Sequence, residues 1–133
     1  VLVNRTVSKA EALADAVSQV NPDVRVTVKG TDATGLREDL AAADVVVQSS
    51  SIGLHPDDLP AIPLALLTPQ VTLLDMIYRQ TKLLAAAESI GCRVADGKSM
   101  LLHQGVKSLC IWTGCDAPPV EPMREALYAA LNS

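Results

Sequence analysis

Short apolar segments alternate with longer segments of helical periodicity along the chain. Five segments have the length and the β-branched content of strands. Three are apolar runs, one alternates between apolar and polar residues, and one is a short segment that follows a glycine. They are residues 1–3, 24–28, 45–47, 71–76 and 92–95. The runs 1–3 and 45–47 are wholly apolar, which predicts strands that are buried in a sheet.

The segments between these strands predict helices. Ser8 is expected to cap the first helix, because Glu11 follows three residues later at capping-box spacing, and Asn21-Pro22 ends it. Further helices are expected over Leu36–Ala43 and Lys82–Ile90, the second closed by Gly91. The last two helices are expected at residues 97–113 and 121–131.

Strands that alternate with helices at this spacing indicate an α/β fold with a parallel sheet. We expect a Rossmann-like, doubly wound sheet that lacks its first strand and the Gly-rich phosphate turn, because neither lies upstream of Val1. Residues 1–133 are therefore expected to form one partial dinucleotide-binding domain that includes the C-terminal helices. The long polar connection Gln48–Pro63 is a candidate functional loop.

Composition excludes several classes of function. The net charge of −4 and the lack of a basic stripe argue against nucleic-acid binding. Three cysteines without CxxC spacing predict reduced thiols, and no signal peptide or membrane-length apolar run occurs, so we expect a cytoplasmic protein without a membrane partner. His55 and His103 have no second ligand at metal spacing and no Ser/Asp partner, so no metal site and no catalytic triad are expected.

The first polar cluster follows the first strand. Asn4, Arg5 and Thr6 come directly after Val1–Val3, where a dinucleotide-binding fold contacts the adenosine ribose, and Lys9 lies in the next helical turn. Two cations in place of an acidic residue favour a 2′-phosphate, and therefore NADP over NAD. The alternative for Arg5 and Lys9 is two solvated charges at a helix start.

Other polar residues follow the later strands, at the edge of a parallel sheet where ligands bind. Each of these segments could also be an ordinary turn, so their common position at strand ends carries the argument. Gln104 shares a helix face with Met100 and Lys107, and its amide suits the hydroxyls of a small substrate, although it could equally be a surface amide. The strand-end residues are Gln48, Ser49, Ser50, Ser51, Met76, Tyr78, Asp96 and Gly97.

Several of these blocks together resemble the shikimate dehydrogenase family over nearly the whole chain. The block most specific to the family is Asp96-Gly97 together with Met100–Gly105. The block Asn4–Ala10 is nearly as specific. Asp75–Tyr78 and Trp112–Gly114 follow the same order and spacing. The resemblance implies NADP-linked interconversion of 3-dehydroshikimate and shikimate, in the pathway to aromatic amino acids.

The resemblance also implies roles for individual residues. Tyr78 and Gln104 would contact a shikimate-like substrate, and Asp75 would anchor its strand end. No catalytic residue is expected in this chain, because in the family a Lys and an Asp of an N-terminal domain transfer the proton. The isolated chain is expected to be inactive, and the parent protein to be a monomer or a homodimer. The cofactor residues would be Asn4, Arg5, Thr6 and Lys9 at the 2′-phosphate, and Met76, Gly97, Ser49 and Ser50 near the nicotinamide.

Three segments differ from the family pattern. Gln48 stands where Asn is usual, the connection Arg79–Lys82 is shorter than usual, and Lys98-Ser99 replaces Leu-Gly. Because these changes flank the nicotinamide and substrate positions, quinate and aminoshikimate remain alternative substrates. Two further alternatives are a non-catalytic nucleotide-binding remnant and another NADP enzyme, such as a distant tetrahydrofolate dehydrogenase relative.

Overall fold

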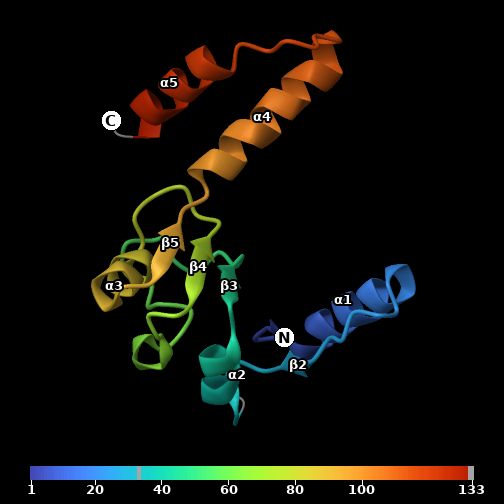
Figure 1. Cartoon of the computed structure of the whole chain (residues 1–133), viewed down its shortest axis with the longest axis vertical. Coiled ribbons are helices and arrows are strands. Elements are labelled where there is room, and N and C mark those ends of the chain that lie inside the picture. Colours follow the sequence, from blue (N-terminus) through green and yellow to red (C-terminus); the bar gives the residue numbers. More distant parts are fainter. Residues whose placement is uncertain (33, 132–133) are drawn as a thin grey trace. The chain divides into compact units, whose positions relative to one another are not determined.

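The computed structural model describes residues 1–32 and 34–131. The predicted domain, residues 1–133, thus includes Ala33, Asn132 and Ser133, which lie outside the described residues. The chain forms two compact units, Val1–Ala43 and Asp44–Ser133 (Figure 1).

The first unit is a pair of parallel strands packed against a helix. Leu2 pairs with Val28 and Val3 with Lys29, and α1 contacts both strands. Ala10 on α1 is buried, and Lys29 Nζ lies 2.6 Å from Asp39 Oδ2, which ties the end of β2 to α2. The elements are β1 (Leu2–Val3), α1 (Val7–Val20), β2 (Val28–Lys29) and α2 (Leu36–Ala42).

Three details predicted for this unit are wrong. Helix α1 begins after Thr6, so Ser8 lies inside the helix and the predicted capping box does not form. Val1 and Val3 are exposed, since β1 has only β2 as a neighbour in its sheet. The strand expected at 24–28 is reduced to Val28–Lys29, because the two-residue β1 offers no longer partner.

The second unit is a three-stranded parallel sheet with helices. The strand order is β3-β4-β5, and α3 packs against β4 and β5 (Figure 1). Thr81 caps α3 through its side chain, and Gly91 ends it in the left-handed conformation at φ 94°. The elements are β3 (Val45–Gln48), the 3₁₀ turn η1 (Leu64–Leu66), β4 (Thr72–Asp75), α3 (Lys82–Ile90), β5 (Arg93–Ala95), α4 (Lys98–Thr113) and α5 (Val120–Leu131).

Only one face of this sheet is well covered. Val46, Leu73 and Val94 are aligned across the three strands and face a core that includes Leu84 and Ala87 of α3. On the alternate positions Val45 and Val47 are exposed, by 59% and 53%, so the burial predicted for the run 45–47 is wrong at these two residues. Since side chains alternate along a strand, the second face of β3 is left open to solvent. The buried core comprises Leu67, Leu73, Leu83, Leu84, Ala87 and Cys92.

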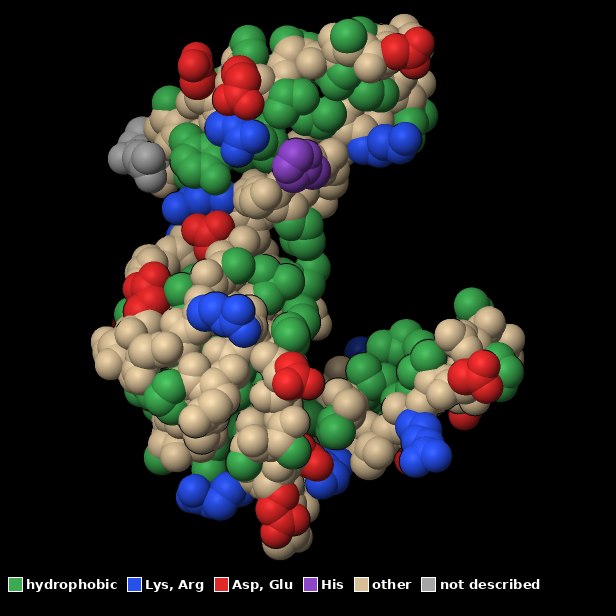
Figure 2. All heavy atoms as spheres, viewed as in Figure 1, with side chains coloured by type: hydrophobic (Ala, Val, Ile, Leu, Met, Phe, Trp, Pro, Cys, Tyr) green, Lys and Arg blue, Asp and Glu red, His purple; other side chains and the backbone are tan. Residues whose placement is uncertain are grey.

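Helices α4 and α5 form a hairpin that begins at the end of β5 (Figure 1). Gly105 of α4 lies against Met123 of α5, and Lys98 Nζ lies 5.9 Å from the centroid of the Tyr128 ring. Hydrophobic side chains are visible over this hairpin in Figure 2. Across residues 1–32 and 34–131, no helix combines the length and the apolar character that crossing a bilayer requires.

The α/β class with parallel strands is confirmed, and all five predicted helices are present. The strands form two separate sheets rather than one, β1-β2 and β3-β4-β5. These are the pairings that the nucleotide-binding order 3-2-1-4-5-6 gives for its strands 2 to 6.

Candidate functional site

The first group of candidate residues lies at the end of β1 and the start of α1. Asn4 Oδ1 accepts a hydrogen bond from Thr6 N at 2.8 Å, which fixes the turn between strand and helix. Arg5 and Lys9 are exposed, and among the described residues neither forms an ion pair. Two unpaired cations beside the N-terminus of a 14-residue helix suit a phosphate, which the helix dipole also favours.

The second group lies at the carboxyl ends of β3, β4 and β5. Gln48 and Asp75 are register partners on neighbouring strands and are both buried, by contrast with the exposed Ser49 and Ser50 that follow. Met76 N donates to Gln48 O at 2.9 Å, so the pairing of β3 and β4 extends to the start of the next turn. The ends of these two strands therefore form a single backbone rim.

Gly97 joins the end of β5 to this rim. Its N–H donates to Ile77 O at 3.0 Å, and a Cβ at this position would overlap the carbonyl oxygen of Met76. Because only glycine tolerates this approach, the start of α4 lies directly against the turn after β4. The structure thus brings together Met76 and Gly97, two residues that the sequence placed at one site.

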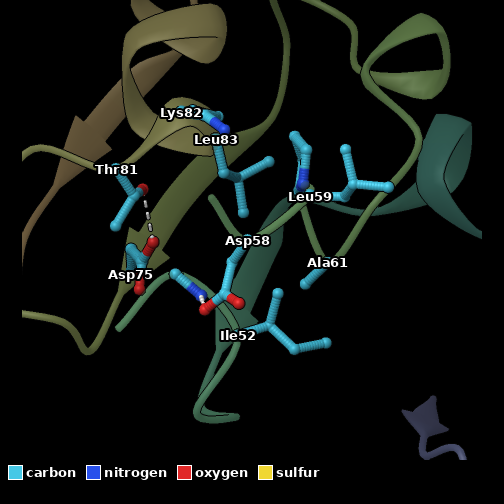
Figure 3. Close-up of a pocket in the computed structure, with 10 residues that line it drawn as sticks. Ile52, Asp58, Leu59, Ala61, Asp75, Thr81, Lys82 and Leu83 are labelled. Carbon is cyan, nitrogen blue, oxygen red and sulfur yellow. Dashed lines mark hydrogen bonds between the residues drawn. The ribbon is translucent and has the colours of Figure 1, made fainter. Parts of the chain in front are cut away.

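Asp75 anchors the end of β4, as the resemblance implies. Its side chain is 1% exposed, and Oδ1 accepts from Ile77 N at 3.1 Å while Oδ2 accepts from the Thr81 hydroxyl at 2.8 Å. Figure 3 shows the Thr81 hydroxyl directed at the Asp75 carboxylate. Thr81 Oγ1 in turn accepts from Leu84 N, so one network joins the strand end to the first turn of α3.

Asp58 holds the loop that follows the serines. Its Oδ2 accepts from His55 N at 3.0 Å and from Gly53 N at 2.8 Å, and Arg79 Nη2 donates to Gly53 O at 3.0 Å. The backbone N–H groups of His55 and Gly53 lower the pKa of the Asp58 carboxyl from its usual value. An ionised Asp58 therefore fixes the loop at neutral pH.

Two hollows lie beside this loop, and the first also reaches Asp75 at the end of β4. The crevice in Figure 3, between residues 52–61 and the start of α3, has a volume of about 10 Å³, which is too narrow for a nucleotide. A wider hollow of about 260 Å³ is lined by residues that include His55, Arg79 and Lys82. Neither hollow is lined by the predicted cofactor residues Ser49, Ser50, Met76 and Gly97.

The two predicted substrate residues are accessible. Tyr78, which follows the β4 turn, is 42% exposed, and Gln104 is exposed on α4. Met100 and Lys107 are exposed as well, as expected for residues that share a face with Gln104. Within the described residues, no set of three His, Cys, Asp or Glu side chains could hold a metal ion.

Two structural residues of the site were not predicted. Asp58 could have been recognised from His55-Pro56-Asp57-Asp58, since Asp after Pro commonly accepts from nearby backbone amides. Thr81 stands directly before the helical run Lys82–Ile90, the usual place of an N-cap threonine. Its second partner, Asp75, is six residues away, and no local rule gives that contact.

The parallel strands and the polar strand ends define an α/β nucleotide-binding fold. Among the described residues, Arg5 and Lys9 after β1 form no ion pair and suit a phosphate. In the second unit, the missing Cβ of Gly97 makes room for the Met76 carbonyl, so the ends of β4 and β5 meet closely.

Comparisons with known proteins give the family. The sequence model described as the C-terminal domain of shikimate 5′-dehydrogenase matches residues 97–128. The NADP(+) shikimate dehydrogenase of Natronomonas pharaonis is 43% identical over 132 residues, which cover 98% of this chain and 46% of that protein.

Solved structures agree. A shikimate dehydrogenase crystallised with NADP+ matches with a TM-score of 0.86 at 30% identity, covering 98% of this chain and 46% of that one. Quinate dehydrogenase from Corynebacterium glutamicum, in complex with NAD, matches with a TM-score of 0.84 at 31% identity, covering 97% and 45%. The chain belongs to the shikimate dehydrogenase family. It spans about half the length of the relatives it matches.

Proposed function

We propose that this chain is the cofactor-binding portion of an NADP-dependent shikimate dehydrogenase. The parent enzyme would interconvert 3-dehydroshikimate and shikimate, with hydride exchanged between the nicotinamide and the substrate. The proton-transferring Lys and Asp would come from a part of the polypeptide outside residues 1–133. The chain alone would then bind cofactor but catalyse no turnover.

The contact between Gly97 and the turn after β4 carries this proposal. It holds the ends of β4 and β5 together, and Ser49 and Ser50 follow β3 in the same sheet. We assign the nicotinamide end of NADP to Ser49, Ser50, Met76 and Gly97. The short side chains of Ser49 and Ser50 would allow the ring to lie close to the backbone at this strand end.

The adenosine end is assigned to the first unit. Arg5 can present two parallel N–H donors to a phosphate, and Lys9 adds a point charge from the first turns of α1. Asn4 would hold the turn through its bond to Thr6 N. This arrangement supports NADP as the preferred cofactor.

We assign Tyr78 and Gln104 to the substrate. A phenolic hydroxyl and a carboxamide can both donate and accept, which suits a ring that carries several hydroxyls and a carboxylate. Both side chains are exposed and available for this role. The bound substrate would also need the part of the enzyme that lies outside this chain.

The experiment is a steady-state assay of the full-length protein. Shikimate oxidation is followed at 340 nm with NADP and with NAD, and quinate is tested in parallel. We expect turnover of shikimate with NADP and a lower kcat/KM with NAD. Activity with neither shikimate nor quinate would overturn the proposal.

Quinate is the second candidate substrate. The similarity to a quinate dehydrogenase and the unusual residues Gln48 and Lys98 beside the rim favour its inclusion. A higher kcat/KM for quinate than for shikimate would select this alternative and leave the assignment of the cofactor residues intact.

A further inference from the structure

We propose that Gln48 is a positioning residue for the reaction. Its buried amide sets the turn Ser49–Ile52 and thereby orients the Ser50 hydroxyl as a donor to the nicotinamide riboside half of the cofactor. This inference rests on the proposed function and adds a residue to it. Gln48 acts through the turn and does not itself touch the cofactor.

The amide of Gln48 closes the turn from both sides. Oε1 accepts from Ser50 N at 2.7 Å, while Nε2 donates to Ile52 O at 2.7 Å and to Ser50 O at 3.3 Å. Gln48 is only 6% exposed, so water has little access to replace these bonds. One side chain therefore fixes the backbone two and four residues further on.

The closed turn gives the Ser50 hydroxyl a defined direction. Ile52 N donates to Ser50 Oγ at 3.2 Å, so this oxygen is engaged as an acceptor, and among residues 1–32 and 34–131 its own hydrogen has no acceptor. Ser50 is exposed, and a ligand at the rim can therefore receive this hydrogen bond. Carbonyl and ribose oxygens of a nicotinamide riboside are acceptors of the required kind.

The length of the side chain matters. Asn, the residue usual in the family, is shorter by one methylene, or about 1.5 Å. It cannot accept from Ser50 N and donate to Ile52 O, both at 2.7 Å, unless the backbone of the turn moves. The conformation of Ser49–Ile52 in this chain is therefore matched to glutamine.

The turn also contacts the next strand end. A Cβ on Gly53, directly after the turn, would lie 3.1 Å from Ile77 Cδ1 and 3.2 Å from Thr81 Cγ2. Gln48 O accepts from Met76 N. A shift of the Ser49–Ile52 turn would therefore disturb the backbone on which Met76 is held.

The test uses the full-length protein with Gln48→Met, which keeps the length and removes the amide, and Gln48→Asn, which keeps the amide and shortens the reach. Gln80→Met is the matched control, because Gln80 is exposed and its amide bonds only to Glu88 Oε2 among the described residues. Thermal melting establishes that each variant folds. If Gln48→Met does not fold, Gln48→Asn carries the test.

Two readouts separate positioning from stability. The first is the fluorescence of bound NADPH, which reports the environment of the nicotinamide. The second is the kinetic isotope effect on kcat with NADPH deuterated at the transferred position. We expect both Gln48 variants to lose most of the fluorescence enhancement of bound NADPH. Hydride transfer should slow about tenfold and the isotope effect should increase, because a misplacement of the reacting groups by 1 Å can lower the rate up to about 100-fold. The preference for NADP over NAD should stay within about twofold, because the 2′-phosphate residues are unchanged.

Unchanged NADPH fluorescence and an unchanged isotope effect in both Gln48 variants would overturn the inference. A fall in kcat would not rescue it if both readouts are unaltered, because such a fall indicates only a loss of folded enzyme. The proposed function fails separately, if the parent protein shows no turnover. NADPH fluorescence still tests Gln48 in that case. An unmodified protein that does not bind NADPH overturns both.

Discussion

The amide nitrogen of Gly97 donates to the carbonyl oxygen of Ile77 at 3.0 Å, and this bond holds the start of α4 against the turn after β4. A side chain at position 97, the N-cap of α4, would overlap the Met76 carbonyl, whereas a Cβ at Gly105, inside α4, would have Met123 Cε as its nearest atom, at 3.7 Å. Gly97 and Gly105 therefore have different structural roles.

Gly97→Ala should separate the ends of β4 and β5. Because the new Cβ meets backbone, which cannot move aside as a side chain can, we expect a loss of about 1–3 kcal/mol in the free energy of unfolding. Denaturant titration of the full-length protein measures it. Gly105→Ala is the control, and it should be neutral or stabilising by up to about 1 kcal/mol, as for any helical glycine. Equal effects of the two variants would contradict the close approach at Gly97.

Arg5→Ala should reduce the preference for NADP. A charge-assisted hydrogen bond contributes roughly 1.5–3 kcal/mol, so we expect kcat/KM with NADP to fall about ten- to a hundredfold. The value with NAD should change little, because NAD has no 2′-phosphate. Arg25→Ala, at another exposed arginine of the first unit, should leave the NADP/NAD ratio unchanged. A parallel loss with both cofactors would place Arg5 outside the phosphate site.

Thr81→Val removes a single hydroxyl but should destabilise the second unit strongly. The substitution removes the cap of α3 and leaves the buried Asp75 Oδ2 without its Thr81 partner. Together these losses should cost about 2–4 kcal/mol. Thr113→Val, at the exposed end of α4, should cost about 0.5 kcal/mol or less. Urea unfolding compares the two, and a similar cost for both would argue against the Asp75 network.

The hydrogen bonds of Asp58 should make part of the protein's stability sensitive to acid. Its pKa is lowered in the folded state by the amides of His55 and Gly53. The stabilisation is therefore complete above the unfolded pKa of about 3.9 and is lost as the pH falls through the lower folded value. Asp58→Asn should remove this loss. Melting temperatures between about pH 3 and pH 7 measure it.

Asp57→Asn, at the exposed neighbouring carboxylate, is the control for this titration. The melting temperature of Asp57→Asn should fall with decreasing pH as steeply as that of the unmodified protein, and more steeply than that of Asp58→Asn. Identical pH curves for Asp58→Asn and the unmodified protein would show that the carboxylate does not hold the loop.

Residues 1–133 expressed alone should self-associate. Val45 and Val47 leave apolar surface exposed on β3, an edge strand that can pair with another copy. Val47→Lys should reduce this association, whereas Val20→Lys, also at an exposed valine but at the end of a helix, should not. Analytical ultracentrifugation distinguishes monomer from oligomer, and a monomeric chain at all concentrations would contradict the prediction.

The helices could be predicted because their ends carry local signals. Gly91 ends α3 and Asn21 ends α1 at the expected positions. Ser8 misled, because the capping-box spacing to Glu11 is met by residues that both lie inside the helix, while Thr6 occupies the cap position without a side-chain hydrogen bond. The capping box is a pattern that many helical sequences satisfy by composition alone.

Burial was harder to predict than element type. Val1 and Val3 are as apolar as the residues of a central strand, yet a short strand with one neighbour in its sheet leaves them exposed. In contrast, the polar Gln48 is buried, because its amide has backbone partners within four residues. Hydrophobicity alone ranks these positions in the wrong order. The pairing of Asp75 with Thr81 depends on the path of the turn between them, which periodicity does not describe.

Trp112, near the C-terminal end of α4, is 81% exposed and is the only tryptophan in the chain. The indole emission of residues 1–133 therefore comes from a single position on the α4–α5 hairpin. A surface that covers Trp112 in a larger assembly would shift that emission to shorter wavelength. The chain thus has a built-in optical probe for whatever docks against its last helices.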